Sequence, residues 1–113
     1  MPRKKRSRQG KVINYSAPVW EPLLELARIY IDEFMWMCEV ELKDGSRLQA
    51  YKHSWTRRYL YLDDKGRAFG YAGEERYREV DPEELRRLFD LVVGRRAPFE
   101  DFEEEMSESL EAP

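Results

Sequence analysis

One hairpin decides the fold of this chain: residues 34–50 have the sequence FMWMCEVELKDGSRLQA. In its first half, apolar side chains recur at every second position, which is the period of a strand with one buried face. The predicted buried face consists of Phe34, Trp36, Cys38, Val40 and Leu42. The sequence therefore predicts a domain built outward from this strand.

The turn of the hairpin fixes its register. Lys43-Asp44-Gly45 forms a three-residue loop, with glycine in the left-handed conformation that it adopts without strain. Since the side chains of a strand alternate between its faces, this loop sets Val40 opposite Leu48 and Cys38 opposite Ala50. Apolar side chains then meet across the two strands.

The flanking segments complete an α+β domain. Apolar residues at helical spacing predict a first helix that is capped near Ser16 and ends near Asp32. A second hairpin joins strands 58–63 and 67–72, and residues 76–80 add a short edge strand. Asp81 caps a C-terminal helix that Gly94 ends. The predicted fold is a helix, a four- to five-stranded antiparallel curled sheet or small open barrel, and a C-terminal helix.

The two ends of the chain carry opposite charge, although the net charge is only −3. The first eleven residues contain six cations and no anion, whereas residues 99–113 contain seven anions and no cation. Like charges repel along each end, and little apolar surface offsets the entropy cost of ordering the backbone. We therefore predict a disordered basic arm at 1–14, a single domain at 15–97 and an acidic tail at 98–113.

Residues for catalysis and metal binding are scarce. His53 is the only histidine, and neither a nucleophile motif nor a glycine-rich phosphate loop is present. His53 and Cys38, the only cysteine, supply at most two of the three or four ligands that a zinc site needs. We expect Cys38 to be a small core residue. The chain is predicted to be no enzyme and to need no metal and no cofactor.

The lone cysteine also bears on location, because it suits a reducing compartment. No apolar stretch is long and uncharged enough for a membrane span. The predicted location is therefore the cytoplasm, with no membrane partner. If the source is eukaryotic, the basic residues between Pro2 and Arg6 would also serve as a nuclear-import patch.

Cations alternate with aromatic side chains in residues 51–61, which have the sequence YKHSWTRRYLY. Aromatic rings stack on bases and cations pair with phosphates, so this segment and the arm together predict a nucleic-acid interface. Its predicted phosphate-binding residues are Arg3, Lys4, Lys5, Arg6, Arg8, Lys11, Lys52, Arg57 and Arg58. Its predicted stacking or ligand face is Tyr51, His53, Trp55, Tyr59 and Tyr61. The alternative is that these rings belong to the core and that a helix covers them.

Three functions are compatible with this pattern. The leading expectation is a non-enzymatic module that binds RNA, ribosome or DNA without sequence preference. The alternative is a protein-interaction adaptor or regulator that uses the sheet face or the acidic tail. The third is a small-molecule site in a pocket between the first helix and the sheet.

Overall fold

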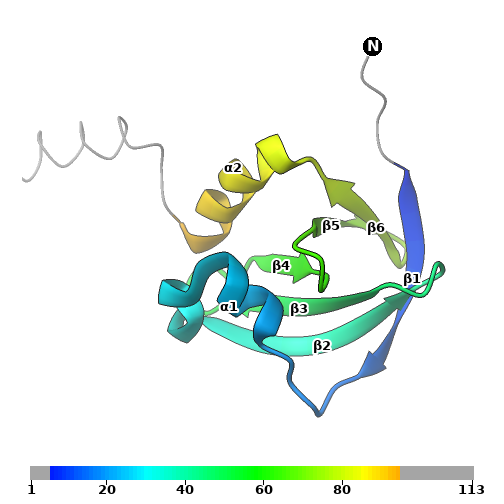
Figure 1. Ribbon diagram of the computed structural model, residues 1–113, viewed down its shortest axis with the longest axis horizontal. Helices are drawn as coiled ribbons and strands as arrows, with labels where there is room; N and C mark the ends of the chain where they lie inside the picture. Colours follow the sequence, from blue (N-terminus) through cyan, green and yellow to red (C-terminus); the bar gives the residue numbers. More distant parts are fainter. Residues whose placement is uncertain (1–5, 95–113) are drawn as a thin grey trace, which may run out of the picture.

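Six antiparallel strands form a closed barrel that carries two helices (Figure 1). The structure is a computed structural model that describes residues 6–94. Along the chain its elements are β1 (Ser7–Asn14), α1 (Glu21–Ala27), the 3-10 helix η1 (Arg28–Glu33), β2 (Phe34–Leu42), β3 (Arg47–His53), β4 (Tyr59–Leu62), β5 (Ala68–Gly73), β6 (Arg76–Val80) and α2 (Pro82–Val93). The α+β class and both helices are confirmed, and the sheet has one strand more than expected and closes completely.

The additional strand is β1, which occupies much of the segment predicted to be a disordered arm. β1 pairs with β2 on one side, with Gly10 opposite Leu42, and with β6 on the other, with Ser7 opposite Arg78. These two ladders bind its backbone groups and offset the entropy cost of ordering them. The predicted disorder is therefore wrong for residues 7–14. The rest of the arm at 1–5 and the predicted tail at 98–113 lie outside the described residues.

The central hairpin has the predicted register. Val40 pairs with Leu48 and Cys38 pairs with Ala50. Gly45 has a φ of +92°, the left-handed conformation that the three-residue loop requires. The same arrangement recurs at the β4–β5 turn, where Gly66 has a φ of +83°.

A bulge exchanges the two faces of β2. Trp36 pairs with Tyr51 and Cys38 pairs with Ala50, which leaves Met37 as an extra residue. Such a bulge restarts the alternation of side chains, so the strand presents different faces before and after it. The predicted single face is therefore wrong, because its members divide between two clusters: Phe34 and Trp36 in one, and Cys38, Val40 and Leu42 in the other.

These two clusters lie on opposite sides of the sheet. In β1, Gly10 is buried whereas its neighbours Gln9 and Lys11 are exposed, so the side that Gly10 faces is the inside of the barrel. The inner cluster consists of Val40, Leu42, Leu48, Phe69 and Tyr77, with Cys38 and Tyr61 packed against it. The outer cluster lies beneath the helices and consists of Leu23, Phe34, Tyr51, Leu60, Leu62, Ala68, Val92 and Val93.

The helices are capped differently from the prediction. α1 is only seven residues long, has Trp20 rather than Ser16 at its N-cap, and continues as η1 to Glu33. Asp81 stands at the N-cap of α2 as predicted, but its side chain makes no capping hydrogen bond. Gly94 ends α2 in the left-handed conformation, as predicted. None of the helices in residues 6–94 is long and apolar enough to cross a membrane.

Candidate functional sites: an anchored loop and an acidic groove

The predicted aromatic face is divided between the two sides of the sheet. Tyr51 pairs with Leu60, and no tyrosine of β4 stands opposite it. Residues that pair across a ladder share a face, so β3 and β4 are offset by one residue from the alignment that would put Tyr51 on the same face as Tyr59 and Tyr61. The prediction that these side chains share one stacking face is therefore wrong. Its strand residues separate into an outer pair, Tyr51 and His53, and an inner pair, Tyr59 and Tyr61.

Tyr51 is a core residue rather than a ligand contact. Its side chain is completely buried, and its hydroxyl donates to the Val19 carbonyl oxygen at 2.6 Å. Its ring centre lies 5.6 Å from that of Trp20, in the segment that leads into α1. Burial raises the pKa of the Tyr51 hydroxyl well above its ordinary value. The alternative expectation, that a helix covers this side of the sheet, is confirmed for Tyr51.

Of the inner pair, Tyr61 packs in the barrel interior and Tyr59 lies at the surface. Tyr59 is 39% exposed and stacks on Tyr61, with 5.8 Å between the ring centres. The Lys52 Nζ atom lies 5.9 Å from the Tyr59 ring centre, and Tyr61 contacts the buried Tyr77 at 5.2 Å. Burial raises the pKa of the Tyr61 hydroxyl. Of the two inner tyrosines of the predicted stacking face, Tyr59 is therefore the accessible one, and Lys52 lies beside it.

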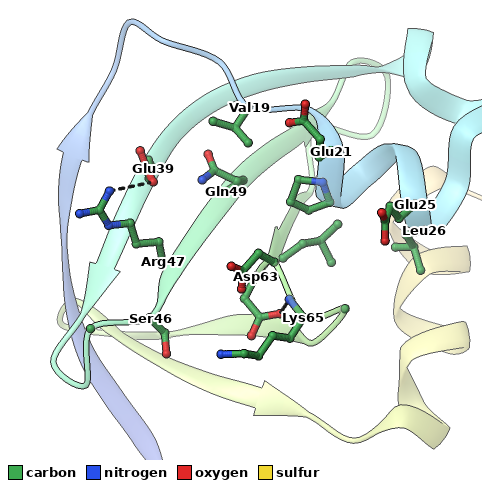
Figure 2. A pocket seen from close by; sticks show the side chains of 15 residues that line it. Val19, Glu21, Glu25, Leu26, Glu39, Ser46, Arg47, Gln49, Asp63 and Lys65 are labelled. Atoms are coloured by element: carbon green, nitrogen blue, oxygen red, sulfur yellow. Dashed lines mark hydrogen bonds and ion pairs between the residues drawn. The ribbon is translucent and has the colours of Figure 1, made fainter.

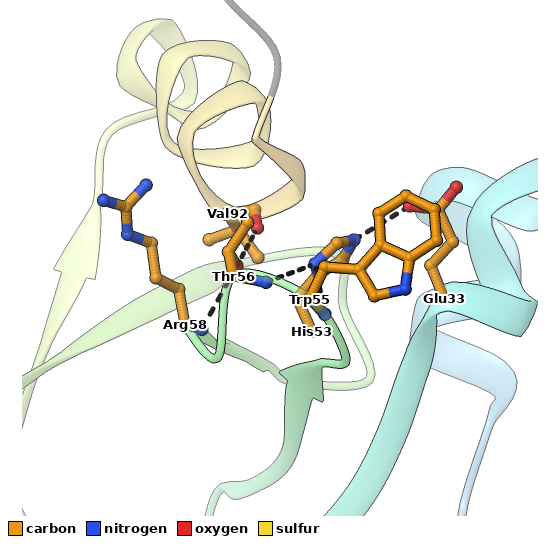
Figure 3. A network of polar contacts seen from close by, with 6 residues as sticks. All are labelled: Glu33, His53, Trp55, Thr56, Arg58 and Val92. Atoms are coloured by element: carbon orange, nitrogen blue, oxygen red, sulfur yellow. Dashed lines mark hydrogen bonds and ion pairs between the residues drawn. The ribbon is translucent and has the colours of Figure 1, made fainter.

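His53 organises the loop between β3 and β4 (Figure 3). Its buried ring accepts hydrogen bonds at Nδ1 from the backbone N–H groups of Trp55, at 3.3 Å, and Thr56, at 3.2 Å. A ring nitrogen that accepts carries no proton, so the proton resides on Nε2, which lies 2.8 Å from Glu33 Oε1. One histidine thereby ties this loop to η1.

The same loop is anchored to the C-terminus of α2. Thr56 Oγ1 donates to the Val92 carbonyl oxygen at 2.5 Å, and Arg58 Nη1 donates to the Leu91 carbonyl oxygen at 2.9 Å. Carbonyl groups in the last turn of a helix lack the usual partner four residues on, so these bonds help to satisfy them, and the Leu91 carbonyl oxygen also accepts from the Gly94 N–H at 3.2 Å. A cation also interacts favourably with the negative end of the helix dipole. Part of the predicted role of Arg58 is therefore structural.

The anchored loop presents Trp55 to solvent. The indole is 79% exposed, and its ring contacts His53 edge to face at 6.1 Å between centres. No acidic residue occurs between positions 52 and 59. We call the accessible residues of this segment the loop patch: Lys52, Trp55, Arg57, Arg58 and Tyr59. These are five of the eight site residues that the sequence predicted between 51 and 61.

The described cations of the predicted arm have different surroundings. Arg6 is exposed before β1, and Lys11 is exposed on the strand. Arg8 Nη1 lies 3.2 Å from Asp44 Oδ2, and the Arg8 guanidinium lies 5.8 Å from the Phe69 ring centre. Arg8 is therefore part of the packing at the end of the barrel. Arg3, Lys4 and Lys5 lie outside the described residues.

A groove of about 610 Å³ separates α1 from the ends of the β2–β3 and β4–β5 hairpins (Figure 2). It lies between the first helix and the sheet, where the sequence placed a pocket. Five carboxylates and two cations are among its lining residues: Glu21, Glu25, Glu39, Asp63, Asp64, Arg47 and Lys65. Its wall is therefore acidic, which disfavours the phosphates of a nucleic acid.

Gln49 and Asp63 are the buried polar residues of this groove. Gln49 is 5% exposed, and its Oε1 accepts a hydrogen bond from Trp36 Nε1 at 2.8 Å. Asp63 is 1% exposed and accepts from the Lys65 and Arg67 backbone N–H groups and from Arg67 Nε. Asp63 is therefore saturated within the protein, whereas Gln49 uses only its acceptor.

Neither of these two residues was predicted as a site residue. Asp63 directly precedes the turn Asp64-Lys65-Gly66, and an aspartate at that place commonly accepts the N–H groups of the turn, so a signal was present. Gln49 lies between Leu48 and Ala50, and strict alternation assigns it to the outside of the sheet. No sequence signal shows that Gln49 is nearly buried on that side.

In the described part of the chain, no group of three or more His, Cys, Asp or Glu residues is placed to hold a metal ion. Comparisons with protein-family models, with curated proteins and with solved structures give no match. Function is therefore inferred from the residues and their geometry alone.

Proposed function

We propose that the protein is a non-enzymatic module that binds single-stranded nucleic acid through the loop patch, in the cytoplasm or, in a eukaryote, also in the nucleus. The observation that carries this proposal is the exposure of Trp55 on an anchored loop whose sequence holds three cations within three residues of it. An aromatic ring held in place loses little entropy when a base stacks on it. Such stacking needs no particular base, so the binding is independent of sequence.

The cations supply most of the affinity. Lys52, Arg57 and Arg58 lie within three residues of Trp55 in the sequence, and Arg3, Lys4, Lys5 and Arg6 add four charges that precede β1 in the sequence. Each phosphate contact releases counterions, so affinity falls as salt rises. If all seven cations contact a single strand, the slope of log affinity against log salt is about −5.

The test is a salt titration of the full chain with labelled oligouridine and oligodeoxythymidine, followed by fluorescence anisotropy. Trp55→Ala should weaken binding by about 5- to 100-fold at every salt concentration without changing the slope, because stacking carries no charge. Arg57→Gly should make the slope shallower by about 0.7, because it removes one phosphate contact. Arg57 has a φ of +66°, which glycine adopts without strain, so this variant keeps the loop intact.

Lys43→Gln is the matched control, since it removes one charge from the β2–β3 turn, beyond the opposite end of β3. It should bind like the wild type. Absence of binding by the wild type, or equal effects of Lys43→Gln and Arg57→Gly, would contradict the proposed function. The protein-interaction alternative is favoured by a different feature, the acidic groove.

A further inference from the structure

The acidic groove has carboxylates that the protein itself leaves available. Glu21 and Glu25 are exposed and stand one turn apart on α1, so they lie on the same side of the helix. Asp64 is exposed at the β4–β5 turn. The other two acids are engaged, since Asp63 binds Arg67 and Glu39 lies 3.7 Å from Arg47. Three carboxylates therefore remain available in the groove, two on the α1 wall and one on the wall formed by the β4–β5 turn.

Gln49 adds a directed hydrogen-bond donor to the groove. The Trp36 indole N–H can only donate, so the bond to it fixes the oxygen of the Gln49 amide on that side. Gln49 Nε2 consequently points the other way, and no residue in the described part of the chain accepts from it. It is not among the fully enclosed atoms without a partner, so it reaches the open space of the groove that Gln49 lines.

We infer that this groove binds a basic peptide segment of a partner protein. A backbone carbonyl of that peptide accepts the hydrogen bond from Gln49 Nε2, while its lysine or arginine side chains pair with Glu21 and Glu25. Val19, Pro22, Leu26 and Leu62 give the groove apolar surface for the peptide backbone and side-chain stems. This site is separate from the loop patch and does not depend on the proposed nucleic-acid binding.

The groove offers both a hydrogen-bond donor, Gln49 Nε2, and negative charge, and this combination selects the class of ligand. A polyamine carries cations but has no acceptor for the Gln49 amide, and a nucleic acid has acceptors but carries the wrong charge. A basic peptide has both in one chain. The volume of about 610 Å³ is within the range of sites that hold small ligands or a few peptide residues.

The experiment measures binding of a fluorescein-labelled peptide of alternating alanine, arginine and lysine to the full chain by anisotropy. The double variant Glu21→Gln/Glu25→Gln should weaken binding at least tenfold. The control Glu83→Gln/Glu84→Gln removes the same charge from exposed positions in the first turn of α2, outside the groove, and should bind like the wild type. All four side chains are exposed, so both variants should fold.

Two further measurements separate this site from its rivals. Spermidine at equal charge concentration should compete poorly, because it cannot accept from Gln49. Trp55→Ala and Arg57→Gly should bind the peptide like the wild type, so failure here is distinct from failure of the proposed nucleic-acid function. Equal weakening by the control variant, equal competition by spermidine, or equal binding of a peptide with glutamate at its cationic positions would overturn the inference.

Discussion

At the scale of single residues, Asp63 is the polar group on which the β4–β5 turn depends most. Its buried carboxylate holds two backbone N–H groups and the Arg67 guanidinium, the last at 2.6 Å. Asp63→Asn keeps the shape but removes the charge, so we expect the free energy of unfolding to fall by about 2–3 kcal/mol. Urea denaturation measures this change. The exposed neighbour provides the control, because Asp64→Asn should change stability by less than about 0.5 kcal/mol; equal losses would show that Asp63 has no special role.

Single residues also show where the sequence was informative. The conformation of Gly45 was predictable because a three-residue hairpin loop requires a positive φ. The burial of His53 and the role of Thr56 were not, because their partners Glu33 and Val92 come from η1 and α2. A contact between distant segments leaves no mark in either segment when only one sequence is read.

Among the elements, β1 depends on a close approach to β2 at Gly10. A Cβ atom there would lie 2.8 Å from Leu42 Cδ2 and 2.9 Å from Val40 Cγ1. Gly10→Ala should therefore lower the free energy of unfolding by about 1–3 kcal/mol, because the packed inner cluster must move. Gly70→Ala in β5 is the matched control, since a Cβ there meets nothing within 4 Å. Thermal unfolding of both variants measures the difference, and a Gly10→Ala protein as stable as Gly70→Ala would contradict this account.

An element could be predicted when the residues that determine it are close together in the sequence. The central hairpin was predictable because its turn and its apolar alternation lie within residues 34–50. The bulge at Met37 was not predictable, because residues 34–38 are all apolar. A change of face within such a run leaves the sequence pattern unchanged. The offset between β3 and β4 was equally hidden, since the anchored loop between them has no register rule of its own.

For the whole molecule, the barrel requires the residues that charge alone assigned to a disordered arm. Deleting residues 1–11 removes most of β1, all of its pairing with β6 and two of its four residue pairs with β2, so the domain should lose its cooperative thermal transition. Replacing Arg3, Lys4 and Lys5 with serine should leave that transition unchanged, because the strand stays complete. Circular dichroism distinguishes the two. A cooperative transition in the deletion protein would show that β1 is dispensable for folding.

Charge and composition predicted the class of the molecule but not its closure. They predicted one α+β domain between two charged ends. Closure was not predictable, because the pairing of β1 with β6 joins two strands that are far apart in the described chain. The acidic groove was not predictable for a related reason, because its walls come from α1 and from two hairpins that meet through the pairing of β3 with β4.

The pairing of β1 with β6, in which Ser7 lies opposite Arg78, also affects the order in which the strands can pair during synthesis. The first strand leaves the ribosome early, yet one of its two edges has no mate until β6 has been translated. Closing so large a loop is entropically costly, so this seam should be among the last contacts to form. Throughout elongation the nascent chain thus exposes an open edge, a site at which chaperones or neighbouring chains can attach before the molecule is finished.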